Sequence, residues 1–328
     1  MPEPNTVWRP AASLEVLKLR ARMIARIRAF FAERGVLEVE TPALSAAAST
    51  DVHLHSFACR YTGPGDGALY LHTSPEFPMK RLIAAGAGSI YQICKVFRDR
   101  EAGRLHNPEF TLLEWYRIGF DHHALMEEAA ALIADTLAGS RALGTPEKLS
   151  YREAFERHCG LDPHTADSAA LAAVVRAKAI PLSADPLREE ADTLRDLLLT
   201  HTIEPQLGRG RVTLLYDYPA SQAALARIRP CDPPVAERFE IYLEGIELAN
   251  GFHELNDATE QRARFLRDLA RRSIPGLPAM PMDERLLAAL THGLPECSGV
   301  ALGVDRLAML AAGVTSVQDV IAFPIERA

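Results

Sequence analysis

The sequence predicts an α+β fold, and three stretches carry that prediction. Residues 96–116 place apolar β-formers on both sides of a charged stretch, which predicts two strands joined by a polar loop. Residues 239–243 alternate apolar and polar side chains, as a half-buried strand does. Residues 13–34 repeat apolar side chains at three- and four-residue spacing, which predicts an amphipathic helix.

The composition bounds the class of protein. The chain has 328 residues, of which 48% are apolar, enough for one large domain or two small ones. Its net charge of −7 offers no broad basic face for nucleic acid, although local arginine clusters can still bind phosphate. No apolar run approaches the ~20 residues of a membrane span, and the N-terminus lacks the apolar core of a signal peptide.

The cysteines indicate the compartment. The five of them are an odd, scattered set without a CxxC pair. This pattern argues against a disulfide framework or a zinc site and favours a reducing cytosol. We therefore expect a cytoplasmic protein with no membrane span.

The N-terminal part reads as one helix followed by short strands. Ser13 is a suitable N-cap for the helix, and Gly35 is a suitable C-cap. The strand that follows is expected to stop at Thr41-Pro42, because proline cannot donate to a sheet. The short strands expected here lie at residues 36–40, 52–57 and 68–71.

Residues 73–76 open a second helix, expected to run over residues 77–85. Ser74 can cap it, Pro75 fits its first turn, and Glu76 favours the positive N-terminal end. Taken alone, this segment is simply a well-capped helix.

The loop of the 96–116 hairpin carries Arg98, Arg100 and Arg104, so it presents cations beside a sheet. Guanidinium groups in such a place suit a polyphosphate. The same charges fit a salt-bridged surface hairpin, and charge alone does not decide between the two interpretations.

The middle of the chain is mostly helical. Residues 122–138 read as a helix and residues 141–210 as mixed helix and loop. Helices are expected near residues 150–158, 168–178 and 188–200. We expect a mostly helical insertion over about residues 120–210, followed by a strand over residues 211–218.

The C-terminal part holds two candidate site segments. Glu247 and Glu254 stand seven residues apart around residues 249–251, and two carboxylates spaced so across a strand and a turn can share one side of a site. Their oxygens suit Mg²⁺, although surface acids of a negative protein look the same. Residues 297–307 then alternate small and apolar side chains until Asp305-Arg306 begins a helix, so a ligand can approach the backbone beside an arginine.

Five segments in this order resemble the class II aminoacyl-tRNA synthetases. They are GVLEVETP at 35–42 (motif 1), TSPE at 73–76, the hairpin from Phe97-Arg98 to Glu109-Phe110 (motif 2), GIELANGFHEL at 245–255, and residues 297–307 (motif 3). The resemblance implies that residues 1–328 form a single class II synthetase-like catalytic domain, in which helices flank an antiparallel β-sheet. It also implies a homodimer built through motif 1.

The string GRLHNPEFTLLEWYR at 103–117 resembles more narrowly the lysyl-tRNA synthetase paralogues that attach (R)-β-lysine to elongation factor P. Two features favour these ligases over true synthetases. Motif 1 comes too early to leave room for an anticodon-binding barrel, and Ala301 stands where the synthetases have glycine. The resemblance therefore implies elongation factor P as the partner and makes tRNA unlikely. A truncated lysyl-tRNA synthetase, acting on tRNA or making free adenylate, and an inactive paralogue that serves as a binding module remain the alternatives.

The resemblance also implies roles for individual residues. Arg98 would bind the α-phosphate of ATP and the attacking carboxylate, Arg306 would bind the γ-phosphate, and both count as catalytic. Glu247 and Glu254 would hold Mg²⁺. Further ATP contacts would come from Asp99, Arg100, Asn107, Phe110, Leu248 and Gly303. The amino-acid pocket would be formed by Ser74, Pro75, Glu76, Tyr116, Asn250, Glu254 and Ala301, with Glu114 nearby. Two departures from the family pattern, Phe77-Pro78 and Arg100, bear on the local geometry and on the side-chain contact to adenine.

Overall fold

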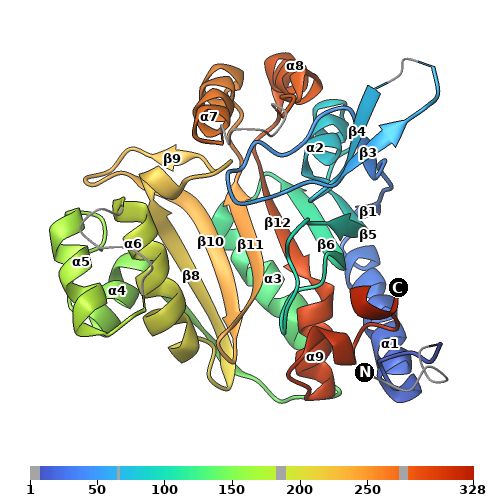
Figure 1. Ribbon diagram of the computed structural model, residues 1–328, viewed down its shortest axis with the longest axis horizontal. Helices are drawn as coiled ribbons and strands as arrows, with labels where there is room; N and C mark the ends of the chain where they lie inside the picture. Colours follow the sequence, from blue (N-terminus) through green and yellow to red (C-terminus); the bar gives the residue numbers. More distant parts are fainter. Residues whose placement is uncertain (1–7, 65–66, 182–189, 273–279) are drawn as a thin grey trace.

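The computed structural model describes residues 8–64, 67–181, 190–272 and 280–328. Most strands of these residues form one large open sheet through the centre of the molecule (Figure 1). In spatial order they are β1 (Leu37–Glu38), β5 (Ile90–Phe97), β6 (Glu109–Ile118), β12 (Cys297–Gly303), β11 (Ile246–His253), β10 (Val235–Leu243), β8 (Arg211–Pro219) and β7 (Gly144–Ser150), with β9 (Ile228–Arg229) beside β10. The pairs from β5 to β8 are antiparallel, whereas β1–β5 and β7–β8 are parallel.

The predicted antiparallel sheet flanked by helices is therefore confirmed, and the strands of the described residues form no closed barrel. A separate small sheet contains β2 (Leu44–Ser45), β4 (Gly67–Leu71) and β3 (Ala58–Tyr61), and β3 and β4 project from one corner of the molecule (Figure 1).

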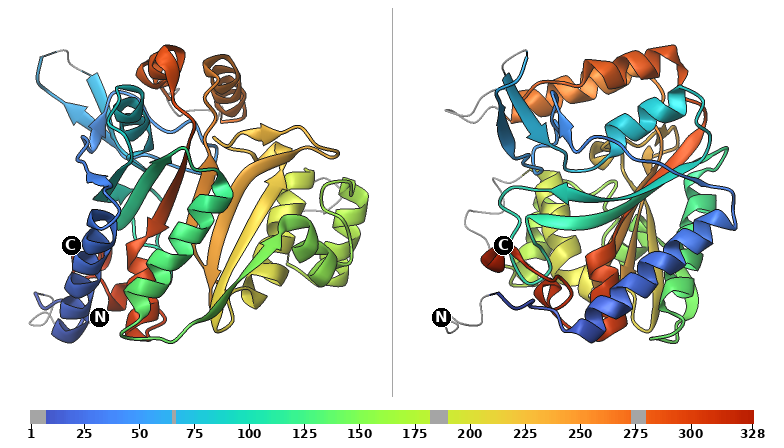
Figure 2. Two further views of the ribbon diagram at one scale, coloured as in Figure 1. Left: turned by 180° about the vertical axis from the view of Figure 1, so that it is seen from behind. Right: turned by 90° about the vertical axis from the view of Figure 1, so that its right-hand side faces the viewer.

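One face of the large sheet is covered by α1 (Leu14–Ala32) and α3 (His122–Leu137), which cross it in the view from behind (Figure 2). Together with α9 (Val304–Ala312) they form the main hydrophobic core. Phe31 of α1 contacts Trp115 of β6 edge to face at 5.4 Å between ring centroids, and both side chains are fully buried. The back face is thus apolar where these helices cover the central strands, and the opposite face of those strands remains for a site.

Two further cores flank the main one. The helices α4 (Tyr151–Cys159), α5 (Ser168–Ala177) and α6 (Ala191–Leu198) pack with β7, β8 and β10 at one end of the sheet (Figure 1). The helices α2 (Glu76–Ala84), α7 (Ala258–Arg271) and α8 (Glu284–Gly293) pack together at the ends of β5, β6 and β12. This third group places the start of α2 at the edge of the open face.

Several predicted elements are confirmed within one or two residues, including α1 with its Ser13 cap, α2, α3, α4, α5 and β8. The predicted strand at 36–40 shrinks to β1, and the one at 52–57 is wrong, because the strand lies at 58–61. The backbone before β3 instead runs beside the arginine loop, where His55 O accepts from Asp99 N. Residues 182–189, where the third predicted helix of the middle region was to begin, lie outside the described residues.

The expected helical insertion over about 120–210 is more closely tied to the sheet than the sequence suggested. Helix α3 belongs to the main core, and β7 is an edge strand in parallel pairing with β8. Among the described residues of this region, α4 to α6 form the separate helical layer. Among the described residues, no helix is long and apolar enough to cross a membrane.

Candidate active site

The open face of the sheet brings three predicted positions into one row. Glu114 of β6 is paired with Ala301 of β12, and Ala301 is paired with Asn250 of β11. Neighbouring strands lie ~4.8 Å apart, so the three side chains stand next to one another. The adjacent row, Leu113, Leu302 and Ala249, faces the dry core behind. Strand alternation alone therefore aims Glu114, Ala301 and Asn250 at the same cavity.

Two cavities open on this face, and they meet at this row. One, of about 580 Å³, is lined by Arg98, Phe110, Glu247 and Arg306 among others. The second, of about 560 Å³, is lined by Ser74, Glu76, Glu114, Tyr116 and Glu254 among others. Both are also lined by Arg98, Asn250 and Ala301. We call the first the phosphate cavity and the second the amino-acid cavity.

The amino-acid cavity holds a buried ion-pair network. Nζ of Lys80 lies 2.6 Å from Oε1 of Glu76 and 2.6 Å from Oε2 of Glu254. Lys80 and Glu254 are each only 2% exposed, so water screens this network little. Burial alone would lower the pKa of Lys80, but the attraction of Glu254 and Glu76 raises it overall. Burial raises the pKa of Glu254 to about 7.

A third carboxylate completes this cavity. Oε2 of Glu114 accepts from the Ser74 hydroxyl at 2.6 Å, and its Oε1 accepts from the Tyr116 hydroxyl at 2.6 Å. Burial, and then the charge of Glu76, raise the pKa of Glu114 to about 8. The Ser74 hydroxyl also accepts from the backbone N–H of Glu76 at 3.0 Å, which fixes the start of α2.

Gly299 makes room for this arrangement. A Cβ at this position would lie 2.3 Å from the Tyr116 ring and 2.5 Å from Oε1 of Glu254. Gly299 of motif 3 is therefore needed because two side chains approach its backbone closely, and not because its backbone angle is unusual. Pro75, predicted to touch the substrate, is the N-cap of α2 and does not line either cavity.

Sequence reasoning missed Lys80. The signal was present, because Glu76 and Lys80 are four residues apart at the start of a helix and such pairs meet. What the sequence did not reveal is that Lys80 turns inward with the buried residues Met79 and Ile83, and so meets Glu254, the residue that follows β11.

The phosphate cavity carries the two predicted arginines. Nε of Arg98 donates to Thr73 O at 3.4 Å, and its guanidinium carbon lies 5.0 Å from the centre of the Phe110 ring. Arg306 donates from Nη1 to Glu247 O at 2.8 Å and to Glu247 Oε2 at 3.2 Å. Its Nη2 lies 2.8 Å from Nε2 of His106. Burial and the charge of Arg306 lower the pKa of His106, which favours the neutral ring as the acceptor of this bond.

Asp305 fixes the position of Arg306. This carboxylate is 3% exposed, pairs with Arg20 of α1, and accepts from the backbone N–H of Thr111 at 3.0 Å. It thereby ties the first turn of α9 to the start of β6. Asp305 thus anchors the start of α9, and the neighbouring Arg306 presents its guanidinium to the cavity.

The remaining predicted ATP contacts divide into two groups. Phe110, Leu248 and Gly303 line or border the phosphate cavity. Asn107 also lines it, but its amide is engaged in the protein: Nδ2 donates to Glu109 O at 2.7 Å, and Oδ1 accepts from Ile325 N at 3.0 Å. It anchors the loop to the C-terminal segment.

Asp99 and Arg100 line neither cavity. Oδ1 of Asp99 accepts from the backbone N–H of Arg100 at 2.9 Å. Arg100 has a φ of 69° and an exposed side chain, so it belongs to a surface turn.

One prediction requires correction. Glu247 and Glu254 cannot contact the same ion, because β11 is extended from Ile246 to His253 and seven residues of strand span ~23 Å. The sequence suggested a turn at residues 249–251. Gly251 is instead a strand residue whose missing side chain admits the Phe239 ring, which would lie 2.4 Å from a Cβ.

The structure places another carboxylate near Glu247. Glu240 of β10 lies on the neighbouring strand and lines the phosphate cavity with Glu247 and Glu204. Burial, followed by repulsion from Glu240 and Glu247, raises the pKa of Glu204 to about 7. A cluster of carboxylates whose charges oppose one another fits a divalent cation, because the ion relieves that repulsion.

The family model described as tRNA synthetases class II (D, K and N) matches residues 6–327. The chain belongs to this family. The match spans every residue discussed above, including the sheet, both cavities and the helices that surround them.

Curated relatives resemble the chain over its whole length. A protein of Vibrio cholerae is 54% identical over 99% of both chains, one of Salmonella gallinarum is 53% identical and one of Klebsiella pneumoniae is 52% identical, each again over 99% of both chains. All three are named elongation factor P–(R)-β-lysine ligase.

Proposed function

We propose that this protein is an ATP-dependent ligase that activates (R)-β-lysine as an adenylate and transfers it to a lysine ε-amino group of elongation factor P. The names of the relatives support this reaction. The observation that carries it is the meeting of a carboxylate-rich cavity and an arginine-bearing cavity at Arg98, Asn250 and Ala301. An amino-acid carboxylate and an α-phosphate brought together there can react.

The charges of the amino-acid cavity match a diamino acid. Glu76, Glu114 and Glu254 carry three negative charges when ionised, and Lys80 supplies one positive charge. Two negative charges remain for the two ammonium groups of the substrate. An amino acid with one ammonium would leave a buried carboxylate without a partner, which is costly.

Arg98 and Arg306 are the proposed catalytic arginines. Arg98 lines both cavities, so it is placed to bind the attacking carboxylate and the α-phosphate at once. Arg306 lines only the phosphate cavity and would bind the γ-phosphate after releasing Glu247. Positioning and charge neutralisation are the main requirements of phosphoryl chemistry, and both come from these side chains. Phe110 offers a ring face for adenine.

Glu240 and Glu247 would hold Mg²⁺, which when bound would neutralise charge on the phosphates. Glu254 keeps the substrate-binding role but not the metal-binding role. Its contact with Lys80 places it in the amino-acid cavity.

The proposal extends to assembly and location. Strand β1 is at the edge of the large sheet, and Leu37 within it is 55% exposed although apolar. This supports a homodimer through residues 35–42, which sedimentation at micromolar protein would test. A protein that modifies a translation factor would act in the cytoplasm.

A truncated lysyl-tRNA synthetase is the second candidate, and an inactive binding module is the third. The methyl group of Ala301 favours the ligase, because it stands between Asn250 and Glu114 and narrows the pocket where an α-amino group would enter. The side chains retained at Arg98 and Arg306 disfavour the inactive module.

ATP–pyrophosphate exchange with different amino acids tests the proposal. We expect rapid exchange with (R)-β-lysine and slower exchange with α-lysine. A preference for α-lysine would favour the synthetase, and no exchange with either amino acid would favour the binding module.

A further inference from the structure

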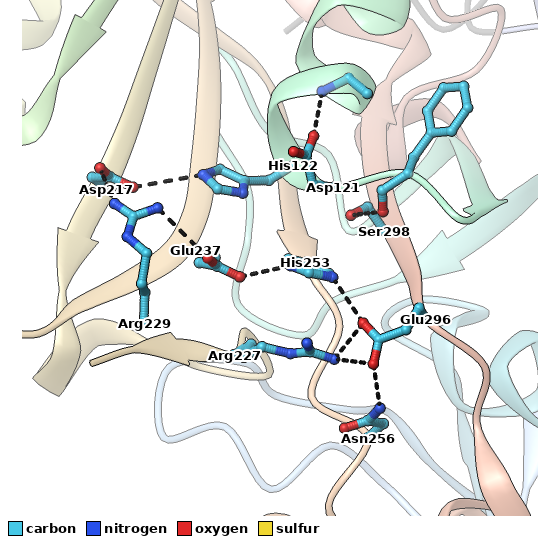
Figure 3. A network of polar contacts seen from close by, with 12 residues as sticks. Asp121, His122, Asp217, Arg227, Arg229, Glu237, His253, Asn256, Glu296 and Ser298 are labelled. Carbon is cyan, nitrogen blue, oxygen red and sulfur yellow. Dashed lines mark hydrogen bonds and ion pairs between the residues drawn. The ribbon is translucent and has the colours of Figure 1, made fainter. Parts of the chain in front are cut away.

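The back face of the sheet carries a second polar cluster (Figure 3). Its residues His122, Glu237 and His253 line neither of the two cavities. His253 and Glu254 are neighbours on the chain, and successive residues of a strand point to opposite faces. Glu254 faces the amino-acid cavity, so His253 faces the back. There it meets Glu237 of β10 and His122, the first residue of α3.

These three side chains have the spacing of metal ligands. One ligand atom from each of His122, Glu237 and His253 lies within 4.8 Å of the other two. Nδ1 of His253 lies 2.6 Å from Oε2 of Glu237. Two imidazoles and one carboxylate form a ligand set that suits Zn²⁺.

His122 supplies an independent sign of a ligand. Its side chain is 2% exposed, and neither of its ring nitrogens has a hydrogen-bond partner. The nearest carboxylate oxygen, Oδ1 of Asp217, lies 3.6 Å from Nε2 and also lacks a hydrogen-bond partner. A buried imidazole without partners is costly unless something binds it.

The surroundings fit a bound cation in two ways. Asp217, Glu237 and Glu296 face Arg227 and Arg229, so three carboxylates meet two guanidiniums and one negative charge remains. Each histidine also has a carboxylate on one nitrogen: Asp217 faces Nε2 of His122, and Oε2 of Glu296 lies 3.3 Å from Nε2 of His253. Metal-bound histidines almost always donate their other N–H to such an acceptor.

A salt-bridged network without metal is the simpler alternative. A protonated His253 held between Glu237 and Glu296 would balance the charge. It would leave the buried His122 without a hydrogen bond on either nitrogen and with only the 3.6 Å contact to Asp217, so it accounts for only half of the cluster.

We propose that His122, Glu237 and His253 bind one Zn²⁺ ion through Nδ1 of each histidine and a carboxylate oxygen, with Asp217 and Glu296 orienting the rings. The scattered cysteines gave no hint of this site, because it contains none. The ion links the start of α3 to β10 and β11 on the back of the sheet.

Zinc titration of the full-length protein tests the proposal after dialysis against a chelator. With ZnCl₂ as the probe, we expect one equivalent bound per chain, a rise in Tm, and visible absorption typical of tetrahedral coordination when Co²⁺ replaces Zn²⁺. The variants His122→Gln and His253→Gln should each lose the bound equivalent, and Asp217→Asn should weaken binding by about 10–100-fold.

Two control variants sharpen the test. His123→Gln alters the neighbouring ring, 4.1 Å from that of His122 but outside the ligand set, and should keep the equivalent. Glu247→Gln should keep it too, which separates this site from the phosphate cavity. If circular dichroism shows that His122→Gln does not fold, His253→Gln and the Co²⁺ spectrum of the unmutated protein decide whether the zinc site exists. Absence of stoichiometric zinc in the unmutated protein, or its retention in a folded His122→Gln or His253→Gln variant, would overturn the proposal.

Discussion

The buried charges of the amino-acid cavity and the charge of Arg98, which lines both cavities, are held in different ways. In the amino-acid cavity every buried charge already has a partner: Lys80 lies 2.6 Å from Glu76 and Glu254, and Glu114 accepts two short hydrogen bonds. In the phosphate cavity Arg98 is 3.8 Å from its nearest paired carboxylate, Glu101, and both side chains are 25% exposed. The first cavity is thus organised before a ligand arrives, whereas Arg98 remains available.

This difference fits the two ligands. A diamino acid is small, and a rigid set of paired carboxylates can select it by charge and by the room at Ala301. A polyphosphate carries several charges, and arginines that exchange weak partners for phosphate oxygens gain most from it.

Replacing Lys80 should cause the largest loss in the free energy of unfolding. In Lys80→Met, Glu76 and Glu254 would be left close together without their cation, and breaking a buried ion pair in this way costs about 3–5 kcal/mol. Chemical denaturation should show this loss in the free energy of unfolding. Lys95→Met is the matched control, because Lys95 forms only an exposed pair with Glu109 and its loss should cost at most about 1 kcal/mol. Equal stability of the two variants would contradict a pre-paired cavity.

Arg98→Ala should reduce pyrophosphate exchange by ~10²-fold or more while the fold is retained, since in the proposed reaction its charge would stabilise the transition state. Arg100→Ala, in the same loop but with a side chain that lines neither cavity, should leave exchange nearly unchanged. Near-normal exchange in Arg98→Ala would remove this residue from the catalytic role.

Ala301→Gly should change which lysine isomer is used. Removing one methyl group from a pocket is worth roughly 1–3 kcal/mol, or about 10–200-fold in discrimination. The variant should gain activity with α-lysine and lose much of its preference for (R)-β-lysine, measured as the ratio of kcat/KM values at saturating ATP. An unchanged ratio would place selectivity elsewhere, with Glu76 or Tyr116 as the next candidates.

The last prediction concerns pH, and its effect is spread over several pH units. Glu114 has a pKa raised to about 8, so the folded protein holds a proton that the unfolded chain releases near pH 4.5. Because of this carboxyl, the free energy of unfolding should therefore fall as pH rises from about 5 to 8, by at most about 1.4 kcal/mol per pH unit. The stability of the unmutated protein relative to Glu114→Gln should fall over that range, and a diamino substrate should reduce the fall because it favours the ionised form. A constant or rising difference would contradict the assignment.

The sequence revealed more of the local structure than of the long-range contacts. Helix α1 and its Ser13 cap, the hairpin of β5 and β6, and the turn into α9 at Asp305-Arg306 follow from neighbouring residues. The parallel pairings of β1 and β7 were missed, because they join segments far apart in the chain.

The same limit explains what was missed in the site. Arg98, Glu76 and Ala301 were predicted as candidate site residues because each lies in a recognisable segment, and the structure places all three in the lining of the amino-acid cavity. Glu240 was missed because it nears Glu247 only through pairing of β10 with β11, and Lys80 because its partner Glu254 comes 174 residues later. Gly251 led to the wrong prediction of a turn at residues 249–251. The sequence alone does not distinguish a strand glycine that leaves room for an aromatic ring from a glycine in a turn.

Transfer to the protein substrate tests the central claim most directly. Elongation factor P would be incubated with the ligase, ATP and (R)-β-lysine, and its intact mass measured against reactions without ATP and with the Arg98→Ala variant. We expect the mass to increase by one β-lysyl group on a single lysine, only with ATP and the unmutated ligase. We also expect that tRNA in place of elongation factor P is not charged. An unchanged elongation factor P together with efficient charging of tRNA would contradict it.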